Sequence, residues 1–304
     1  MTQPKTKIVC VVGPTATGKT TLGINIASAF NGEIINADSR QFYKELVIGT
    51  AKPSAAELNR AAHHLIDCAS ITRPWTVADF VGHAKEVIDN LTARGKLPVV
   101  VGGTGMYIKS LLFGLDPVPK VDENIQCELQ GQLEGRGLKV LYEELKAVDP
   151  QSAERLSPND TQRIIRALGV YRQTGRPLHE FWQSGERAGA YDCITFASAL
   201  SREILYRAIN LRVEKMMALG LKQEALALIN RYPGNQIIQK TIGYAEWLQI
   251  DSLGDQGVLE LIKKNTRHFA KRQLTWFKNM SDVIWADFAN AKSVMGRIGS
   301  VASY

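Results

Sequence analysis

The feature that most constrains the fold is a phosphate-binding loop directly after a short apolar run. Residues 13–20 read GPTATGKT and match the pattern G-x-x-x-x-G-K-[ST] at every fixed position. The preceding KIVCVVG is continuously apolar, as in a buried parallel strand, and residues 20–30 have helical periodicity. This order predicts a P-loop at the carboxyl edge of a parallel sheet.

This loop has the chemistry to bind a di- or triphosphate, ATP included. Its glycines let backbone amides turn toward phosphate oxygens, and the start of the following helix adds a positive dipole end. Lys19 supplies a mobile cation, and Thr20 carries a hydroxyl that can ligate Mg²⁺, the expected cofactor. The predicted diphosphate- or nucleotide-binding residues are Gly13, Pro14, Thr15, Ala16, Thr17, Gly18, Lys19 and Thr20.

The rest of the chain predicts an α/β fold with a helical insertion. Strand-like segments at 32–36 and 97–101 alternate with a helix at 77–91, the signature of a parallel sheet flanked by helices. Strand signals then cease until 193–200, and residues 185–190 form a glycine-containing return linker. We therefore predict a core of residues 1–114 and 193–304 interrupted by a helical domain at 115–192. Further helices are expected at 202–219, 222–231 and 258–279.

The composition indicates where the protein acts and which partners it lacks. The 304 residues are 45% hydrophobic, but no apolar run is long enough to span a bilayer, and the first residues lack a signal-peptide pattern. We expect a cytoplasmic protein without a membrane partner. The four cysteines are far apart in sequence, so neither a zinc site nor a disulfide framework is expected.

Positive charge is concentrated near the carboxyl end. The net charge is +7, and residues 263–278 contain six Lys or Arg, one His and no acidic residue. Three aromatic residues are interleaved, a composition that suits phosphate contacts combined with anchoring in a core. A solvated basic face is the alternative.

Two polar residues follow strand ends, where ligands bind in parallel sheets. Asp38 comes just after the strand at 32–36, and Thr104 lies in the glycine turn after the strand at 97–101. Asp38 could accept a proton, hold water on Mg²⁺, or cap a helix. Thr104 could face a ligand or cap the next helix.

Two further groups have plainer interpretations. Arg163 and Arg166 lie on neighbouring positions of one predicted helix face, where basic residues could instead be exposed and paired with Asp160. His63 and His64 precede a strand-like stretch at 65–67, and we assign them no catalytic role.

Eight segments together match one family. In this order the chain resembles the tRNA dimethylallyltransferases, also called tRNA isopentenyltransferases, over nearly its full length. The segments are GPTATGKT (13–20), ADSRQFY (37–43), GTAKPS (49–54), HHLID (63–67), GGTGMY (102–107), NDTQRIIRAL (159–168), IGYAEW (242–247) and TRHFAKRQLTWFK (266–278).

The resemblance implies a P-loop nucleotide-kinase-like parallel sheet core with an inserted helical domain, and a channel between the two. Dimethylallyl diphosphate would bind with its diphosphate on the P-loop and Mg²⁺. The exocyclic amine of adenosine 37, next to the tRNA anticodon, would attack the allylic carbon, and diphosphate would leave. In the family pattern Asp38 matches the base, Thr104 a positioning residue and Arg212 an arginine that reaches the diphosphate.

Most of the implied tRNA contacts lie in three segments, 38–41, 162–166 and 271–272, and Thr104 and Gln126 are separate. Two follow from the resemblance, and Lys271 and Arg272 follow from the basic run. Gln126 stands where many relatives have an arginine that contacts tRNA, and Gly169 stands where Glu is usual. The predicted tRNA-binding residues are Asp38, Ser39, Arg40, Gln41, Thr104, Gln126, Gln162, Arg163, Ile164, Ile165, Arg166, Lys271 and Arg272.

Two other function classes share parts of this pattern. An isopentenyltransferase acting on free adenine nucleotides would share the P-loop and the base, but it would not need a long basic helix. A P-loop kinase or NTP-binding regulator would usually have an acidic residue ending the strand at 97–101, where Gly102 stands. We therefore favour a tRNA-modifying enzyme, expected to act as a monomer.

Overall fold

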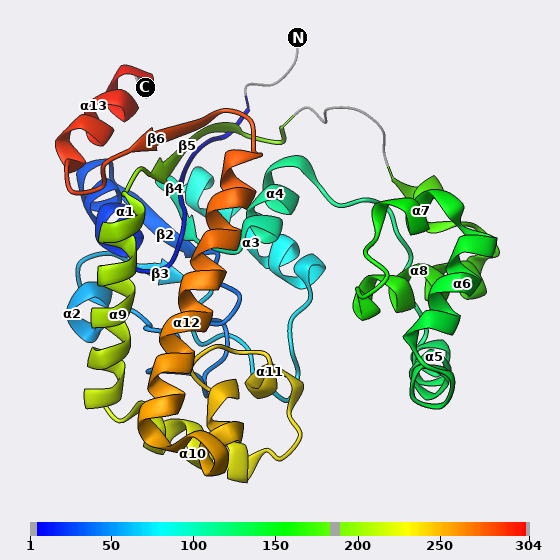
Figure 1. Cartoon of the computed structure of the whole chain (residues 1–304). Coiled ribbons are helices and arrows are strands. Elements are labelled where there is room, and N and C mark those ends of the chain that lie inside the picture. The colour runs from blue at the N-terminus through cyan, green and yellow to red at the C-terminus, as the bar shows by residue number, and fades with distance from the viewer. Residues whose placement is uncertain (1–4, 183–188, 302–304) are drawn as a thin grey trace. The chain divides into compact units, whose positions relative to one another are not determined.

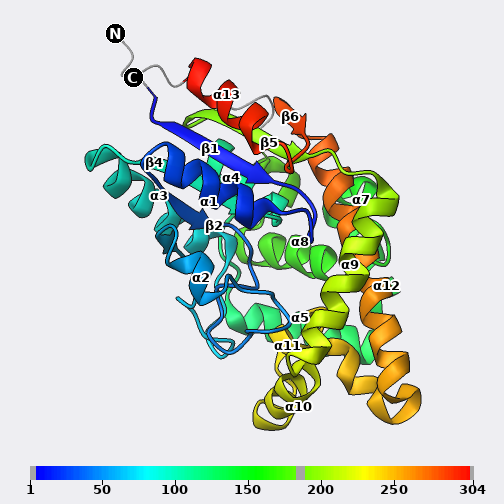
Figure 2. The ribbon, with the colours of Figure 1, turned by 90° about the vertical axis from the view of Figure 1, so that its left-hand side faces the viewer.

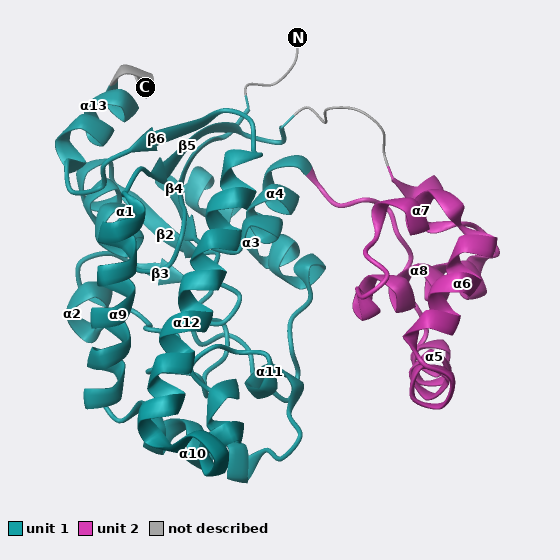
Figure 3. Cartoon of the chain, in the orientation of Figure 1, with its two compact units in different colours: residues 1–113, 189–304 teal, residues 114–188 magenta. Residues whose placement is uncertain are grey.

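The computed structural model describes residues 5–182 and 189–301 and divides the chain into two compact units (Figure 1). Unit 1 contains residues 1–113 and 189–304, and unit 2 contains residues 114–188 (Figure 3). The sequence predicted an insertion at 115–192, whereas the chain returns to unit 1 at Gly189, and the Ala190 N–H donates to the Leu112 carbonyl at 2.8 Å. Most of the predicted return linker at 185–190 lies outside the described residues.

In the described part of unit 1, six parallel strands form one sheet in the order β3-β2-β4-β1-β5-β6. Strand β1 is central, and its register with β4 brings Val12 opposite Gly102. The strands are β1 Lys7–Val12, β2 Gly32–Asn36, β3 His63–His64, β4 Leu97–Gly102, β5 Asp192–Ser198 and β6 Val283–Ala286.

Two helical layers cover the sheet, because alternate residues of each strand face opposite sides. On β1, Ile8 and Cys10 join the core formed with α3 and α4, whereas Val9 and Val11 join the core formed with α1 and α13. Figure 2 shows α1 and α13 on the same side of the sheet. The fold is therefore a three-layer α/β/α sandwich.

Most helices of unit 1 begin at a capping side chain or a glycine. Helix α3 starts with a capping box, in which Thr76 and Asp79 satisfy each other's backbone N–H groups. The helices are α1 Lys19–Ala29, α2 Ala55–Leu58, α3 Val77–Ala93, α4 Gly105–Phe113, α9 Arg202–Ala218, α10 Leu221–Arg231, α11 Gln236–Gln239, α12 Ile250–Lys278 and α13 Ala291–Val301, with the 3₁₀ turn η2 Ala245–Gln249.

Unit 2 is helical and has its own apolar core. Leu129, Leu141, Leu145 and Leu168 are fully buried in it. Gly169 is also buried there, and a Cβ at this position would come within 2.9 Å of a Val121 methyl group. Its elements are α5 Glu123–Arg136, α6 Leu138–Val148, α7 Pro150–Arg155, α8 Thr161–Thr174 and the 3₁₀ turn η1 Leu178–Phe181.

The sequence prediction missed or misplaced several elements, among them β3, β6 and α13. The short strand β3 consists of His63 and His64 themselves, not of residues 65–67, and it pairs with Ile34 and Ile35 of β2. Strand β6 and helix α13 were not predicted. Strand β6 has only four residues, so its signal in the sequence is weak, and it is stabilised by pairing with β5. Helix α13 packs on the core of α1.

Candidate active site

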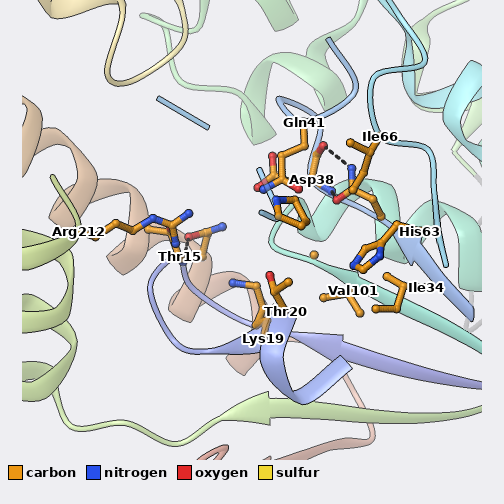
Figure 4. A pocket seen from close by; sticks show the side chains of 14 residues that line it. Thr15, Lys19, Thr20, Ile34, Asp38, Gln41, His63, Ile66, Val101 and Arg212 are labelled. Carbon is orange, nitrogen blue, oxygen red and sulfur yellow. Dashed lines mark hydrogen bonds between the residues drawn. The ribbon is translucent and has the colours of Figure 1, made fainter. Parts of the chain in front are cut away.

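One pocket in unit 1 collects the polar residues that follow the strand ends (Figure 4). The P-loop follows β1, Asp38 follows β2 and Gly102 ends β4, so three segments far apart in sequence meet at the carboxyl edge of the sheet. The pocket is lined by Thr15, Lys19, Thr20, Ile34, Asn36, Asp38, Gln41, Pro53, His63, Ile66, Val101, Gly102, Arg212 and Gln273.

The P-loop has the backbone of an anion cradle. Gly13 and Gly18 have φ of 129° and 81°, and Ala16 also has a positive φ of 63°. Gly18 caps α1 without a side-chain acceptor, which leaves the first amides of that helix available to an anion. The Thr17 hydroxyl donates to the Pro14 carbonyl at 2.9 Å and closes the loop on itself.

Two cations from different elements converge on this cradle. Lys19 opens α1 and donates to the Pro14 carbonyl, and Arg212 reaches in from α9 (Figure 4). Among the described residues neither forms an ion pair within 4 Å. Burial, followed by repulsion from Arg212, lowers the pKa of Lys19 to about 7, and burial also lowers the pKa of Arg212. Because two poorly solvated cations share the pocket, it favours a multiply charged anion.

Asp38 is held in place by its own loop and by Asn36. The Asn36 side chain accepts from the Asp38 N–H at 3.1 Å and donates to the Asp38 carbonyl at 3.3 Å. The Asp38 carboxylate accepts from the Arg40 N–H at 3.0 Å. The helix-cap interpretation is wrong, because residues 39–42 form turns and the next described helix starts at Ala55. Asp38 instead closes an Asx turn beside the P-loop cations.

Thr104 supports this loop rather than lining the pocket. Its hydroxyl accepts from the Ser39 N–H at 3.0 Å, and its N–H donates to the Ala37 carbonyl at 3.3 Å. Its carbonyl accepts from the N–H groups of Tyr107 and Ile108 in the first turns of α4, so only its backbone serves as a helix cap. Gly102 is required here, because a Cβ would lie 2.3 Å from the Ala37 carbonyl.

The remaining residues of the 38–41 segment differ in exposure. Ser39 and Arg40 are half-buried, whereas Gln41 is buried and lines the pocket. The Gln41 side chain donates to the carbonyls of Thr50 and Ala51 at 3.1 and 3.3 Å. Its side chain therefore fixes the neighbouring loop.

Sequence reasoning missed three polar side chains of the pocket, those of Asn36, His63 and Gln273. Asn36 was visible as a polar residue ending an apolar strand. His63 lines the pocket, its Nδ1 lies 2.8 Å from the Ala61 carbonyl, and burial lowers its pKa. Gln273 lies inside the quoted segment 266–278, but only the fold brings its side chain to the P-loop.

In unit 2 the predicted tRNA contacts lie in different environments. Gln162 and Arg163 are exposed, and the Arg163 Nε lies 3.4 Å from Asp160, as the paired interpretation expected. Arg166 instead donates to the Pro119 carbonyl at 2.8 Å. Gln126 donates to the Val121 carbonyl at 3.0 Å.

The two isoleucines of this segment pack against the core of unit 2. Ile164 is fully buried, and Ile165 packs against the same core. Their side chains therefore stabilise α8 on its neighbours.

The basic run on α12 is less uniform than its sequence suggests. Lys271 and Arg272 are exposed, as predicted for polyanion contacts. Lys263 is buried and forms ion pairs with Glu214 at 2.9 Å and Glu260 at 3.0 Å, so it is not available to a partner. The acidic partners come from outside the segment, and its sequence alone could not reveal them.

The interleaved aromatic residues divide in the same way. Phe277 is fully buried and anchors α12 in the core. Phe269 and Trp276 are 36% and 39% exposed, so they are anchored less deeply than Phe277.

The pocket offers few direct metal ligands. Among the described residues no group of three or more His, Cys, Asp or Glu could hold a metal ion. The Thr20 hydroxyl and the Asp38 carboxylate line the same pocket. Both are oxygen donors, and Mg²⁺ commonly takes one or two such ligands together with phosphate oxygens and water. The residues therefore fit a cation that is bound mainly by a diphosphate.

The described helices include none that is both long enough and apolar enough to cross a membrane.

Comparison with known sequences gives one consistent family. The model of the IPP transferase family matches residues 41–280. The tRNA dimethylallyltransferase of Geobacter metallireducens is 44% identical over 291 residues, which cover 94% of each chain.

Solved structures agree with this result over both units. The tRNA isopentenylpyrophosphate transferase of Bacillus halodurans is 34% identical and has a TM-score of 0.72, with 97% of this chain and 96% of that chain covered. A eukaryotic dimethylallyltransferase acting on tRNA is 28% identical, with a TM-score of 0.82 over 98% of this chain and 77% of the other.

Proposed function

Because the chain belongs to the IPP transferase family, we propose that it transfers a dimethylallyl group from dimethylallyl diphosphate to the exocyclic amine of adenosine 37 in tRNA, releasing diphosphate. The observation that carries this proposal is the pocket itself. It sets a phosphate loop and two cations, Lys19 and Arg212, which form no ion pair within 4 Å among the described residues, opposite one carboxylate, Asp38.

The chemistry of the reaction matches this arrangement. The exocyclic amine of adenine is a weak nucleophile, because its lone pair is delocalised into the ring. An allylic diphosphate compensates by breaking its C–O bond readily when the departing negative charge is stabilised. The P-loop amides, Lys19 and Arg212 would supply that stabilisation, so the loop would bind a leaving group and not a phosphoryl donor.

Asp38 would act as the base. As the new C–N bond forms, the amine nitrogen becomes positively charged and must lose a proton, which the carboxylate can take. The Arg40 N–H donates to this carboxylate, Asn36 holds the Asp38 backbone, and the Thr104 hydroxyl holds the adjacent Ser39 backbone. Thr104 would therefore position the loop that carries the base.

We propose Mg²⁺ as the metal, with Thr20 as its protein ligand. The ion would neutralise charge on the diphosphate when it is bound. The apolar residues Ile34, Ile66 and Val101 in the same pocket would exclude water, which protects an allyl cation from hydrolysis.

The tRNA would contact exposed basic residues of both units, among them Lys271 and Arg272 on α12 and Arg163 on α8. Their charge would supply the salt-dependent part of the affinity. We expect the enzyme to act as a monomer in the cytoplasm. A transferase for free adenine nucleotides is not favoured, since the relatives are named for tRNA.

The decisive experiment is incubation of the purified protein with dimethylallyl diphosphate, Mg²⁺ and unmodified tRNA. We expect a mass increase of one dimethylallyl group on a single anticodon-loop adenosine. A parallel reaction with AMP tests the free-nucleotide class, and ATP hydrolysis tests the kinase class. Rapid ATP hydrolysis without a prenylated product would refute the proposal.

A further inference from the structure

Helix α12 presents two different faces within one turn. Lys271 and Arg272 face solvent, whereas Gln273, between them and the buried Phe277, is 6% exposed and lines the pocket. A buried amide side chain must be hydrogen-bonded to offset its desolvation. Its partners therefore indicate what it does.

Gln273 bridges the two loops that form the floor of the pocket. Its Oε1 accepts from the Thr15 N–H at 3.0 Å, and its Nε2 donates to the Gly103 carbonyl at 2.9 Å. The backbone fixes which end of the amide is which, because an N–H can only donate and a carbonyl can only accept. No flipped orientation satisfies both contacts.

The packing around this bridge leaves no spare room. A Cβ on Gly103 would lie 2.2 Å from the Gln273 Nε2 and 3.1 Å from the Gly13 carbonyl. One turn further along α12, Trp276 lies so close to Gly105 that a Cβ there would be 2.1 Å away. Because Gly103 and Gly105 have no side chains, Gln273 and Trp276 of α12 can pack directly against the backbone of the 102–105 turn.

We propose that Gln273 is a positioning residue that holds the P-loop and the 102–105 turn in register with the tRNA-facing side of α12. This inference rests on the proposed function. The Thr104 hydroxyl of the same turn supports the loop that carries Asp38, so the bridge connects the diphosphate cradle to the base. Lys271 and Arg272 lie in the same turn of α12 as Gln273. An RNA bound to them is therefore held in a fixed position relative to the diphosphate cradle and to Asp38.

The bridge also assigns a role to one P-loop amide. The Thr15 N–H is engaged by Gln273, so it shapes the loop, and the diphosphate is left to the amides of residues 16–18 together with Lys19. Fewer P-loop amides are therefore available to bind the diphosphate than the sequence motif alone would suggest.

The test uses three variants of the whole protein. Gln273→Met keeps the size of the side chain and removes both hydrogen bonds. Gln273→Glu keeps the acceptor for Thr15 but loses the donor to Gly103. Thr241→Val is the matched control, because it removes a buried hydrogen bond, to the Ile237 carbonyl, outside the pocket.

For Gln273→Met we expect a fall of roughly 10–10² in kcat, the size of loss that a small misplacement of reacting groups produces. The affinity for inorganic pyrophosphate with Mg²⁺ should fall about tenfold or less, by the same loss of alignment. The tRNA affinity should stay within about twofold, because Lys271 and Arg272 are unchanged. Gln273→Glu should weaken pyrophosphate binding further, since it adds a negative charge beside the cradle.

A merely structural role predicts a different outcome. In that case Gln273→Met and Thr241→Val would lower Tm alike, and both would retain wild-type kcat and pyrophosphate affinity below Tm, which would overturn the inference. Pyrophosphate binding also separates the two proposals. If the wild type transfers no dimethylallyl group, the proposed function fails, while the pyrophosphate measurements still decide whether Gln273 organises the P-loop.

Discussion

Strand β2 separates two clusters of charge that are built in opposite ways. At its start, the buried Glu33 carboxylate contacts Arg94 at 2.6 Å, His64 at 2.7 Å and the Lys96 ammonium. Beyond its carboxyl end, Lys19 and Arg212 share a pocket with Asp38, yet among the described residues neither cation has an ion-pair partner within 4 Å. Both clusters contain more cations than acids, but only the first brings them into contact.

The difference distinguishes charges that stabilise the fold from charges that await a ligand. Around Glu33 the hydrogen bonds outweigh the cost of burial and lower the pKa of this carboxyl to about 2. Around Lys19 burial is not compensated, and its pKa falls to about 7. A diphosphate would supply the missing negative charge, so the buried positive charge of the second cluster is compensated only when a diphosphate binds.

The largest effect is expected at Asp38. Asp38→Asn keeps the shape of the side chain and its acceptor for the Arg40 N–H, but it cannot take up the amine proton. We expect the transfer rate to fall by roughly 10²–10⁴, the usual contribution of a general base. Single-turnover rates with bound tRNA measure this directly. Near-normal turnover would remove Asp38 from the chemistry, provided that tRNA affinity is retained.

Removing one cation from each cluster sharpens the comparison. Lys19→Met should lower kcat by roughly 10²–10³, the loss that follows removal of one stabiliser of developing negative charge. It should leave Tm unchanged or raised, because an uncompensated buried charge is lost. Lys96→Met is the matched control and should lower Tm while transfer continues at the wild-type rate. The reverse pattern would contradict the division into structural and ligand-binding charges.

Loss of the acid in the first cluster should affect stability and not activity. Glu33→Gln leaves Arg94 and Lys96 without their carboxylate, but both are partly exposed and can turn to water. We therefore expect a loss of about 1–2 kcal/mol in the free energy of unfolding. Urea denaturation at pH 7 measures it, and equal midpoints for wild type and variant would argue that the cluster contributes nothing.

The smallest predicted effect is in acid. Because the pKa of Glu33 is lower in the folded protein than in the unfolded chain, its stabilising contribution is complete above the unfolded pKa, near 4.3. That contribution should disappear as the pH falls toward about 2. The difference in unfolding free energy between wild type and Glu33→Gln should therefore shrink from pH 5 to pH 2.5. A difference that stays constant over this range would show that protonation of Glu33 is not involved.

Local sequence patterns predict much of this structure. The P-loop, the parallel strands and the helical insertion are recognisable because each depends on residues adjacent in sequence, such as glycines in a turn or alternating apolar positions. The same locality identified Asp38 as a residue beyond a strand end. It misjudged the two histidines of β3, since a two-residue edge strand has too little pattern of its own.

By itself, the sequence determined that a phosphate cradle follows a buried strand, that an acid follows the next strand, and that basic residues gather near the carboxyl end. Only the tertiary structure decided which of these groups are free to act. It buried Lys263 between two acids, turned Arg166 and Gln126 onto the backbone of their own unit, and brought Gln273 to the P-loop 258 residues away in sequence. The physical reason is that exposure and hydrogen-bond pairing depend on neighbours distant in sequence, which local spacing does not encode.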